Sequence, residues 1–252
     1  MTSPKSPTAR EGSPLWIYGR HAGAAALANP ARRVRRGLAT KNARDWYARR
    51  GATPAQLDML ADARPDAIDR ELPAGAVHQG FAVLVDDLPR ARLKDVCAPA
   101  EPARPVVVLD QIPAPQNIGA IFRAAAAFGA RAVVAQDRRT PALAGALAKA
   151  AAGAIETTPC ARVVNVSRAL EALRDLGYYC VGLAGEAPAP IGAAPADRPI
   201  ALALGAEGAG LRELVAATCD AGYRIPIAAE MESLNVAAAA AVALYEITAR
   251  RA

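Results

Sequence analysis

The sequence predicts an α/β protein whose carboxyl-terminal part is built on a mainly parallel sheet and is preceded by a smaller α/β domain. Three observations support this fold class. From Val106 onward, short apolar runs alternate with helical patterns, as in βαβ units. The run Val106–Leu109 is continuously apolar, which is typical of a strand buried on both faces. Residues 98–105 contain three prolines and read as a linker.

The composition excludes general disorder. Hydrophobic residues make up 53% of the 252 residues and charged residues 21%, which provides ample material for a core. Aromatic residues are only 4%, so a recognition surface made mainly of stacked aromatic rings is not expected.

Positive charge is concentrated near the amino terminus. The formal net charge is +6, and residues 1–50 carry 11 Lys and Arg against 2 Asp and Glu. Residues 105–252 carry 13 of each sign. This asymmetry favours a nucleic-acid partner over an ordinary solvated surface.

In the amino-terminal half, we expect a disordered tail at residues 1–13, because it is polar and rich in proline, and a domain over residues 14–97. Apolar and helical patterns predict strands at 15–19, 34–39 and 81–85, and helices at 21–28, 42–50 and 54–63.

A linker at 98–104 and a second domain at 105–252 follow. Its predicted strands are 106–109, 132–135, 161–164, 179–183, 200–204 and 223–227, and its predicted helices are 117–128, 141–151, 167–176, 211–217 and one from about 234. Ser167 is the expected cap of the third of these helices.

Cysteine and hydropathy patterns predict a soluble protein of a reducing, cytoplasmic compartment. The four cysteines are widely spaced, without a CxxC pair, and are expected to be core thiols. Residues 1–14 lack the apolar segment of a secretory signal. The longest apolar run, Val236–Tyr245, is about half of a membrane span.

Ligands of open parallel sheets bind beyond the carboxyl ends of the strands. Three such loops carry polar or glycine-rich sequences, at 110–123, 205–210 and 226–235. Taken singly, their residues have ordinary explanations. The glycine cluster could be a tight turn or a weak match to a dinucleotide-binding loop, and Asn117 and Ser233 could be helix caps.

Taken together, the three loops are more specific. Asn117-x-Gly119-Ala120-x-x-Arg123, Gly205-Ala206-Glu207-Gly208-x-Gly210, and Ile225-Pro226 followed by Glu232-Ser233-Leu234-Asn235-Val236 occur in this order. They resemble the three motifs of the SpoU/TrmH family, which are S-adenosylmethionine-dependent RNA 2′-O-ribose methyltransferases. The segment Ile17–Ala22 with Asn29-Pro30 resembles the small domain, similar to ribosomal protein L30e, that binds RNA in the 23S rRNA guanosine members.

The resemblance implies a knotted, SPOUT-like catalytic domain that acts as a homodimer. It also implies that S-adenosylmethionine lies against Leu204, Gly205, Ile225, Pro226, Ser233 and Leu234. Two positions depart from the family pattern, Ala114 in the first motif and Ala237 after the third. Neither lies in the expected catalytic set.

Within that set, the resemblance gives Arg123 the central role. Both histidines, His21 and His78, lie outside the second domain, so that domain cannot supply an imidazole base. Because a guanidinium stays protonated, we expect Arg123 to stabilise a developing alkoxide or a nearby phosphate. Asn117, Glu207, Ser233 and Asn235 are expected to orient Arg123 and the nucleotide, without a metal.

The sequence therefore predicts ribose methylation of RNA, with a guanosine of 23S rRNA as the favoured target and no membrane partner. Phosphate contacts are expected from Arg20, Arg32, Arg33, Arg35, Arg36 and Lys41. Three alternatives stay open: the same reaction on tRNA, a non-catalytic RNA-binding or ribosome-assembly protein, and an oxidoreductase, which the lack of a first-strand glycine fingerprint disfavours.

Overall fold

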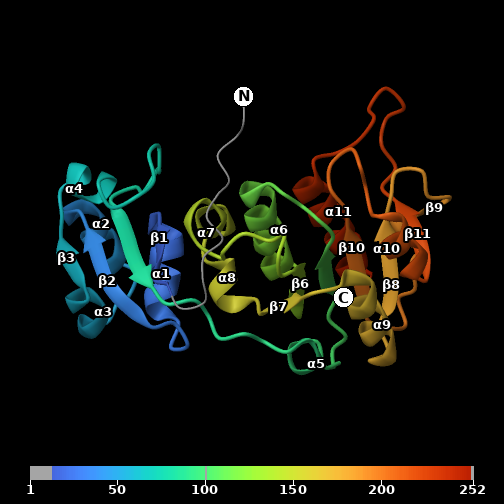
Figure 1. Cartoon of the computed structure of the whole chain (residues 1–252), viewed down its shortest axis with the longest axis horizontal. Helices are drawn as coiled ribbons and strands as arrows, with labels where there is room; N and C mark the ends of the chain where they lie inside the picture. The colour runs from blue at the N-terminus through green and yellow to red at the C-terminus, as the bar shows by residue number, and fades with distance from the viewer. Residues whose placement is uncertain (1–12, 100, 251–252) are drawn as a thin grey trace. The chain divides into compact units, whose positions relative to one another are not determined.

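The computed structural model describes residues 13–99 and 101–250, which form two compact units (Figure 1). The first unit contains the described residues up to Pro89 together with Pro141–Glu156. The second contains Arg90–Thr140 and the described residues from Thr157 onward. The expected tail at 1–13 lies outside the described residues except for Ser13, and the expected linker at 98–104 lies within the second unit.

The first unit is built on a four-stranded sheet in the order β1-β4-β2-β3. Its strands are β1 (Leu15–Tyr18), β2 (Val34–Ala39), β3 (Leu60–Asp62) and β4 (Phe81–Val85). β4 is antiparallel to β1 and β2, whereas β3 is parallel to β2. Buried apolar residues of β1, β2 and β4, including Tyr18 and Leu38, pack with Ile68 and Leu72 in one core cluster.

Its helices are α1 (Arg20–Ala28), α2 (Lys41–Ala48), α3 (Pro54–Asp58), α4 (Pro65–Asp69) and α7 (Gly145–Ala151), with α8 (Ala154–Thr157) ending at the boundary of the unit. The helix expected at 54–63 is wrong in its second half. It ends at Asp58, and Leu60 enters β3 opposite Gly37. A side chain at Gly37 would overlap Leu60, so this pairing depends on a distant glycine and overrides local helical propensity.

The helix α7 was expected in the second domain, but it belongs to the first unit, where it packs against β1 and α1. The segment is anchored by a buried ion pair in which Arg32 Nη2 lies 2.7 Å from Glu156 Oε1. Asn29 Nδ2 donates to the other oxygen of Glu156 at 2.7 Å. The first unit is thus completed by residues that lie far along the chain.

The second unit contains a seven-stranded sheet in the order β7-β6-β5-β10-β8-β11-β9, and every paired neighbour is parallel. The expected mainly parallel sheet is therefore confirmed. Its strands are β5 (Val106–Leu109), β6 (Ala132–Gln136), β7 (Cys160–Val163), β8 (Tyr179–Leu183), β9 (Ala189–Pro190), β10 (Ile200–Leu204) and β11 (Ala221–Arg224). This order places the ends of β5, β10, β8 and β11 along one edge.

Its helices are α5 (Leu93–Val96), α6 (Pro115–Ala127), α9 (Val166–Asp175), α10 (Glu213–Thr218) and α11 (Val236–Ala249), with a short 3-10 helix at Ile191–Ala193. α6 packs against α11, and α9 packs against α5 and α10 (Figure 1). The expected cap of α9 is wrong. Ser167 is buried inside the helix, and Asn165 caps it by accepting from the Arg168 amide at 3.1 Å.

Strand alternation separates the core of the second unit into two faces. Val106 and Val108 of β5 cluster with Leu170 and Leu173 of α9, together with Cys97 and Cys180. All four cysteines are free thiols, and Cys97 and Cys180 are fully buried. Of the helices in the described part of the chain, none has the length and apolar character needed to span a membrane.

Candidate active site

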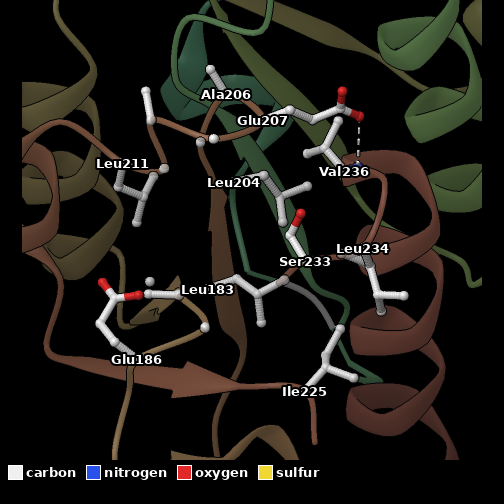
Figure 2. A pocket seen from close by; sticks show the side chains of 18 of the residues that line it. Leu183, Glu186, Leu204, Ala206, Glu207, Leu211, Ile225, Ser233, Leu234 and Val236 are labelled. Atoms are coloured by element: carbon white, nitrogen blue, oxygen red, sulfur yellow. Dashed lines mark hydrogen bonds between the residues drawn. The ribbon is translucent and has the colours of Figure 1, made fainter. Parts of the chain in front are cut away.

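A cavity of about 410 Å³ opens at the carboxyl ends of β8, β10 and β11. Three chain segments supply most of its lining, at 182–186, 204–211 and 232–236 (Figure 2). Strand ends of a parallel sheet are the usual ligand position in such folds, because loops from several strands meet there. The order of the strands thus brings two of the three predicted motifs to one place.

Backbone atoms form much of the cavity wall around Gly205. The loop after β10 folds back on itself, with Ala206 N donating to Gly210 O at 3.1 Å and Gly210 N donating to Ala206 O at 2.8 Å. A Cβ atom on Gly205 would overlap the backbone of Gly210 and Leu211. Only glycine therefore fits at this position, which the glycine cluster of the sequence had not revealed by itself.

Apolar side chains cover another part of the cavity. Leu183, Leu204, Ile225 and Leu234 surround it, with Ser233 between them (Figure 2). Leu204 is 1% exposed and Leu234 is 36% exposed, so the apolar surface runs from the core to the rim. Five of the six residues expected to hold the cofactor line this cavity. The sixth, Pro226, is not among the described residues that line it.

A polar cluster lies beside the cavity and centres on one oxygen of Glu207. Asn117 Nδ2 donates to Glu207 Oε1 at 3.0 Å, and Asn235 Nδ2 donates to the same oxygen at 2.7 Å. The backbone amide of Val236 donates to it at 3.2 Å (Figure 2). Asn235 Nδ2 also reaches Asn117 Oδ1 at 3.1 Å. The cluster joins residues from all three predicted motifs.

Asn235 has a second role as the cap of α11. Its Oδ1 accepts from the amides of Ala237 at 3.0 Å and Ala238 at 3.3 Å. This leaves its Nδ2 group turned toward Glu207. The capping role fixes the orientation of the amide, since the oxygen must face the helix.

Sequence reasoning missed the ion pair that supports the loop of Glu207. Asp110, directly after β5, is fully buried and accepts from the Arg212 backbone amide at 3.0 Å and from Arg212 Nε at 2.9 Å. Arg212 Nη2 lies 2.6 Å from the same carboxylate. A carboxylate that immediately follows a continuously apolar strand was the available signal, because a buried charge requires a partner.

Cys219 also lines the cavity. Burial raises the pKa of its thiol to about 11. The thiol therefore stays protonated at neutral pH and is a poor nucleophile, because the thiolate is the reactive form. Covalent chemistry through this cysteine does not fit the site.

Arg123 is not among the described residues that line the cavity. It lies on α6, six residues after Asn117, and its side chain is exposed. Within the described residues, it makes no hydrogen bond or ion pair. Asn117 of the polar cluster and Arg123 thus share a helix, but within one chain Arg123 does not contact the cluster.

The basic residues expected to bind RNA fall into three groups. Arg32 is only 5% exposed and is paired with Glu156, so a phosphate contact by its side chain does not fit this structure. Arg33 and Arg35 face Asp86, and Arg36 faces Glu71. Arg20 and Lys41 lie at the starts of α1 and α2.

A parallel sheet with a cavity at the carboxyl ends of its strands is typical of the α/β proteins that bind a ligand at this edge. The chain belongs to the SpoU rRNA methylase family, whose model matches residues 104–245.

Two relatives illustrate the breadth of this match. The 23S rRNA (guanosine-2′-O-)-methyltransferase RlmB of a Burkholderia species is 39% identical over 175 residues, which cover 69% of this chain and 71% of the relative. An uncharacterized tRNA/rRNA methyltransferase of Synechocystis is 36% identical over 242 residues, or 93% of this chain and 62% of the relative. The present chain thus spans less than two thirds of that second protein.

A solved structure has a similar fold. The SpoU methyltransferase AviRb from Streptomyces viridochromogenes, crystallised with its cofactor AdoMet, superposes with a TM-score of 0.76 and 25% identity. The match covers 95% of this chain and 91% of AviRb. The fold of this chain is that of SpoU methyltransferases.

Proposed function

We propose that this chain transfers a methyl group from S-adenosylmethionine to a ribose 2′-hydroxyl of RNA, with a guanosine of 23S rRNA as the target. The observation that carries the proposal is the convergence of Asn117, Glu207 and Asn235 beside a glycine-built cavity. Family membership and the similarity to RlmB support the reaction and the substrate class.

The cavity has the properties that S-adenosylmethionine requires. Leu204, Ile225 and Leu234 offer apolar surface for an adenine ring, and the folded loop after Gly205 exposes backbone groups at the wall. Ser233 and Gly205 lie beside them. Bound S-adenosylmethionine would supply an activated methyl group on a sulfonium.

The residues of the chain then have to align the ribose hydroxyl and help it to lose its proton. A guanidinium is a poor base and a good partner for negative charge, so the role of Arg123 in this proposal is to stabilise negative charge on the hydroxyl oxygen or a neighbouring phosphate. Asn117, Glu207, Ser233 and Asn235 orient the nucleotide and Arg123. The donors on Glu207 are neutral, so its carboxylate keeps its negative charge available to attract a guanidinium.

Four further features belong to the proposal: a knotted catalytic domain, an L30e-like RNA-binding domain in the first unit, a homodimer and a cytoplasmic location. The position of β10 between β5 and β8, with the loops after β10 and β11 lining one cavity, supports a knot. Val242 and Tyr245 are exposed on α11, at 43% and 59%, and support a second copy packing there. In such a homodimer, Arg123 would meet site residues of the second copy, a contact that one chain alone does not provide.

The test is transfer of a labelled methyl group from S-adenosylmethionine to unmodified 23S rRNA and tRNA transcripts in parallel, with the product mapped to a ribose. We expect label on 23S rRNA. Label on tRNA alone would keep the reaction and overturn the target. Cofactor binding without label on either RNA would favour a non-catalytic RNA-binding or ribosome-assembly protein.

A further inference from the structure

The arginine run at 32–36 is largely neutralised by acidic side chains. Arg32 is buried against Glu156, and Arg36 Nη1 lies 2.8 Å from Glu71 Oε1. Arg35 makes two hydrogen bonds to Asp86, at 2.8 and 2.9 Å, and this contact lowers the pKa of the Asp86 carboxyl. Arg33 shares Asp86 with Arg35, at 3.9 Å, so the four arginines face three carboxylates and about one positive charge of the run stays uncompensated.

A different set of cations in the first unit has no acidic partner. For Arg20, Lys41, Arg49 and Arg50, no carboxylate lies within ion-pair distance among the described residues. Lys41, Arg49 and Arg50 are exposed, and Arg20 is half-buried. Unpaired cations of this kind attract polyanions because their charge is not already compensated.

Trp46 of α2 contacts two of these cations, Arg20 and Arg50. The guanidinium carbon of Arg50 lies 4.1 Å from the centroid of the indole ring, and that of Arg20 lies 5.9 Å from it. The exposed ring of His21 meets the indole edge-to-face at 5.1 Å. The start of α1 and the end of α2 thus form one basic aromatic surface, in which cation–π contacts orient the guanidinium groups.

A shallow hollow of about 340 Å³ adjoins this surface at Arg20. Thr40, Asn42 and Gln79 line it with hydroxyl and amide groups, and Val77, which is 62% exposed, adds an apolar contact. Gln79 has a left-handed φ of 55°, which is costly for a residue other than glycine. Arg20 stabilises this turn, with Nε donating to Gln79 O at 3.2 Å.

We propose that RNA contacts the first unit on the surface formed by Arg20, His21, Lys41, Trp46 and Arg50, with an unpaired nucleotide in the hollow beside Arg20. The cations contact the phosphates, and the amide and hydroxyl groups of the hollow face the edge of a base. The arginine run at 32–36 stabilises the fold instead. The inference rests on the proposed function, since it names the surface that would deliver the RNA substrate.

The first test compares two triple variants of the full chain that remove the same number of arginine or lysine charges. One is Arg20→Ala/Lys41→Ala/Arg50→Ala, and the control is Arg33→Ala/Arg35→Ala/Arg36→Ala. Affinity for a 23S rRNA transcript is measured over a range of salt concentrations by filter binding. A plot of log K against log salt has a negative slope, and each phosphate contact with a single strand contributes about 0.7 to its magnitude. We expect this magnitude to decrease by about 2 in the first variant and to change little in the control.

Far-UV circular dichroism and urea unfolding of both variants show whether the first unit, which carries all six substitutions, remains folded. An unchanged slope in the first variant, or a larger change in the control, would overturn the inference while the proposed function stands. A wild-type chain that neither binds nor methylates the transcript would instead contradict the proposed function, and the inference with it.

A second test does not depend on removing charge. The chain has two tryptophans, so the variant Trp16→Phe leaves Trp46 as the only indole. We expect its emission to change on saturation with the transcript and not on addition of S-adenosylmethionine alone. Emission that stays unchanged at saturating RNA would place the contact elsewhere. A change of equal size with a polyglutamate chain would indicate an acidic protein partner and would also overturn the inference.

Discussion

Glu207 of the second unit and Asp86 of the first unit each gather several donors, but the donors differ in charge. Glu207 accepts from the amides of Asn117 and Asn235 and from the backbone of Val236. Asp86 accepts from the guanidinium of Arg35. Neutral donors leave the charge of Glu207 uncompensated beside the cavity, whereas the charge of Asp86 is cancelled on the surface. The first arrangement suits a site, and the second suits local stability.

The order of the three motifs predicts which residues lie close together, whereas a count of positive charges does not predict which arginines are free to bind a ligand. Both the three motifs and the arginine run stand out in the sequence. The motifs follow strands that end on one edge of a parallel sheet, so their proximity follows from the fold. The partners of the arginines, Asp86, Glu71 and Glu156, lie far from them along the chain, and no local pattern reveals these pairings.

The largest effect is expected from Arg123→Ala, which tests whether Arg123 acts in catalysis together with the carboxylate of Glu207. Removing one stabilising donor from a reacting oxygen typically lowers turnover about 10²- to 10³-fold. We expect that loss in kcat for methyl transfer, with cofactor affinity unchanged. Arg123→Lys should recover part of the rate if charge alone matters. Near-normal turnover of the alanine variant would remove Arg123 from the mechanism.

The substitutions Glu207→Gln and Asp86→Asn test directly whether the two carboxylates differ in their role, since each replaces a carboxylate by its amide. Loss of charge-assisted hydrogen bonds costs about 1.5–3 kcal/mol, so we expect Glu207→Gln to lower kcat about 10- to 100-fold. Asp86→Asn should leave kcat nearly unchanged. Equal effects of the two substitutions on methyl-transfer kinetics would show that the distinction between the carboxylates is wrong.

The substitution Gly205→Ala tests whether the cavity beside Glu207 requires a residue without a side chain at position 205. The added Cβ overlaps the backbone of Gly210 and Leu211, and overpacking costs about 1–3 kcal/mol, so cofactor affinity should fall about 5- to 150-fold. Gly222→Ala is the matched control, because its Cβ would make an ordinary 3.5 Å contact with Ala187 at the same cavity. Calorimetric titration with S-adenosylmethionine measures both, and similar affinities would contradict a backbone-built wall.

How far the sequence predicts the structure differs along the chain. The strands at 106–109 and 200–204 were predicted because continuous apolar runs leave few alternatives in a parallel sheet. The end of α3 was not, because Leu60 enters a strand only where Gly37 makes room for it. The ion pair between the buried Asp110 and Arg212 was also missed, since the two residues lie 102 positions apart.

The smallest effect is expected from Asp110→Asn, which tests the support beneath the loop of Glu207. The substitution removes charge-assisted bonds to Arg212, whose side chain is 44% exposed and can be solvated, so we expect a loss of about 1–2 kcal/mol in the free energy of unfolding. Asp197→Asn, in an exposed ion pair with Arg198, should cost less than about 0.5 kcal/mol. Urea unfolding measures both values, and equal losses would show that Asp110 gives no special support.

The central claim is that the second unit binds the cofactor and the first unit contacts RNA. Its most direct test is backbone hydrogen exchange measured by mass spectrometry, with cofactor and RNA added in turn. S-adenosylmethionine should slow exchange at 182–186, 204–211 and 225–236 in the second unit. The 23S rRNA transcript should then slow exchange at 20–21 and 41–50, and leave 32–36 unchanged. Protection by S-adenosylmethionine outside the cavity segments, or protection by RNA at 32–36 without 41–50, would contradict the account.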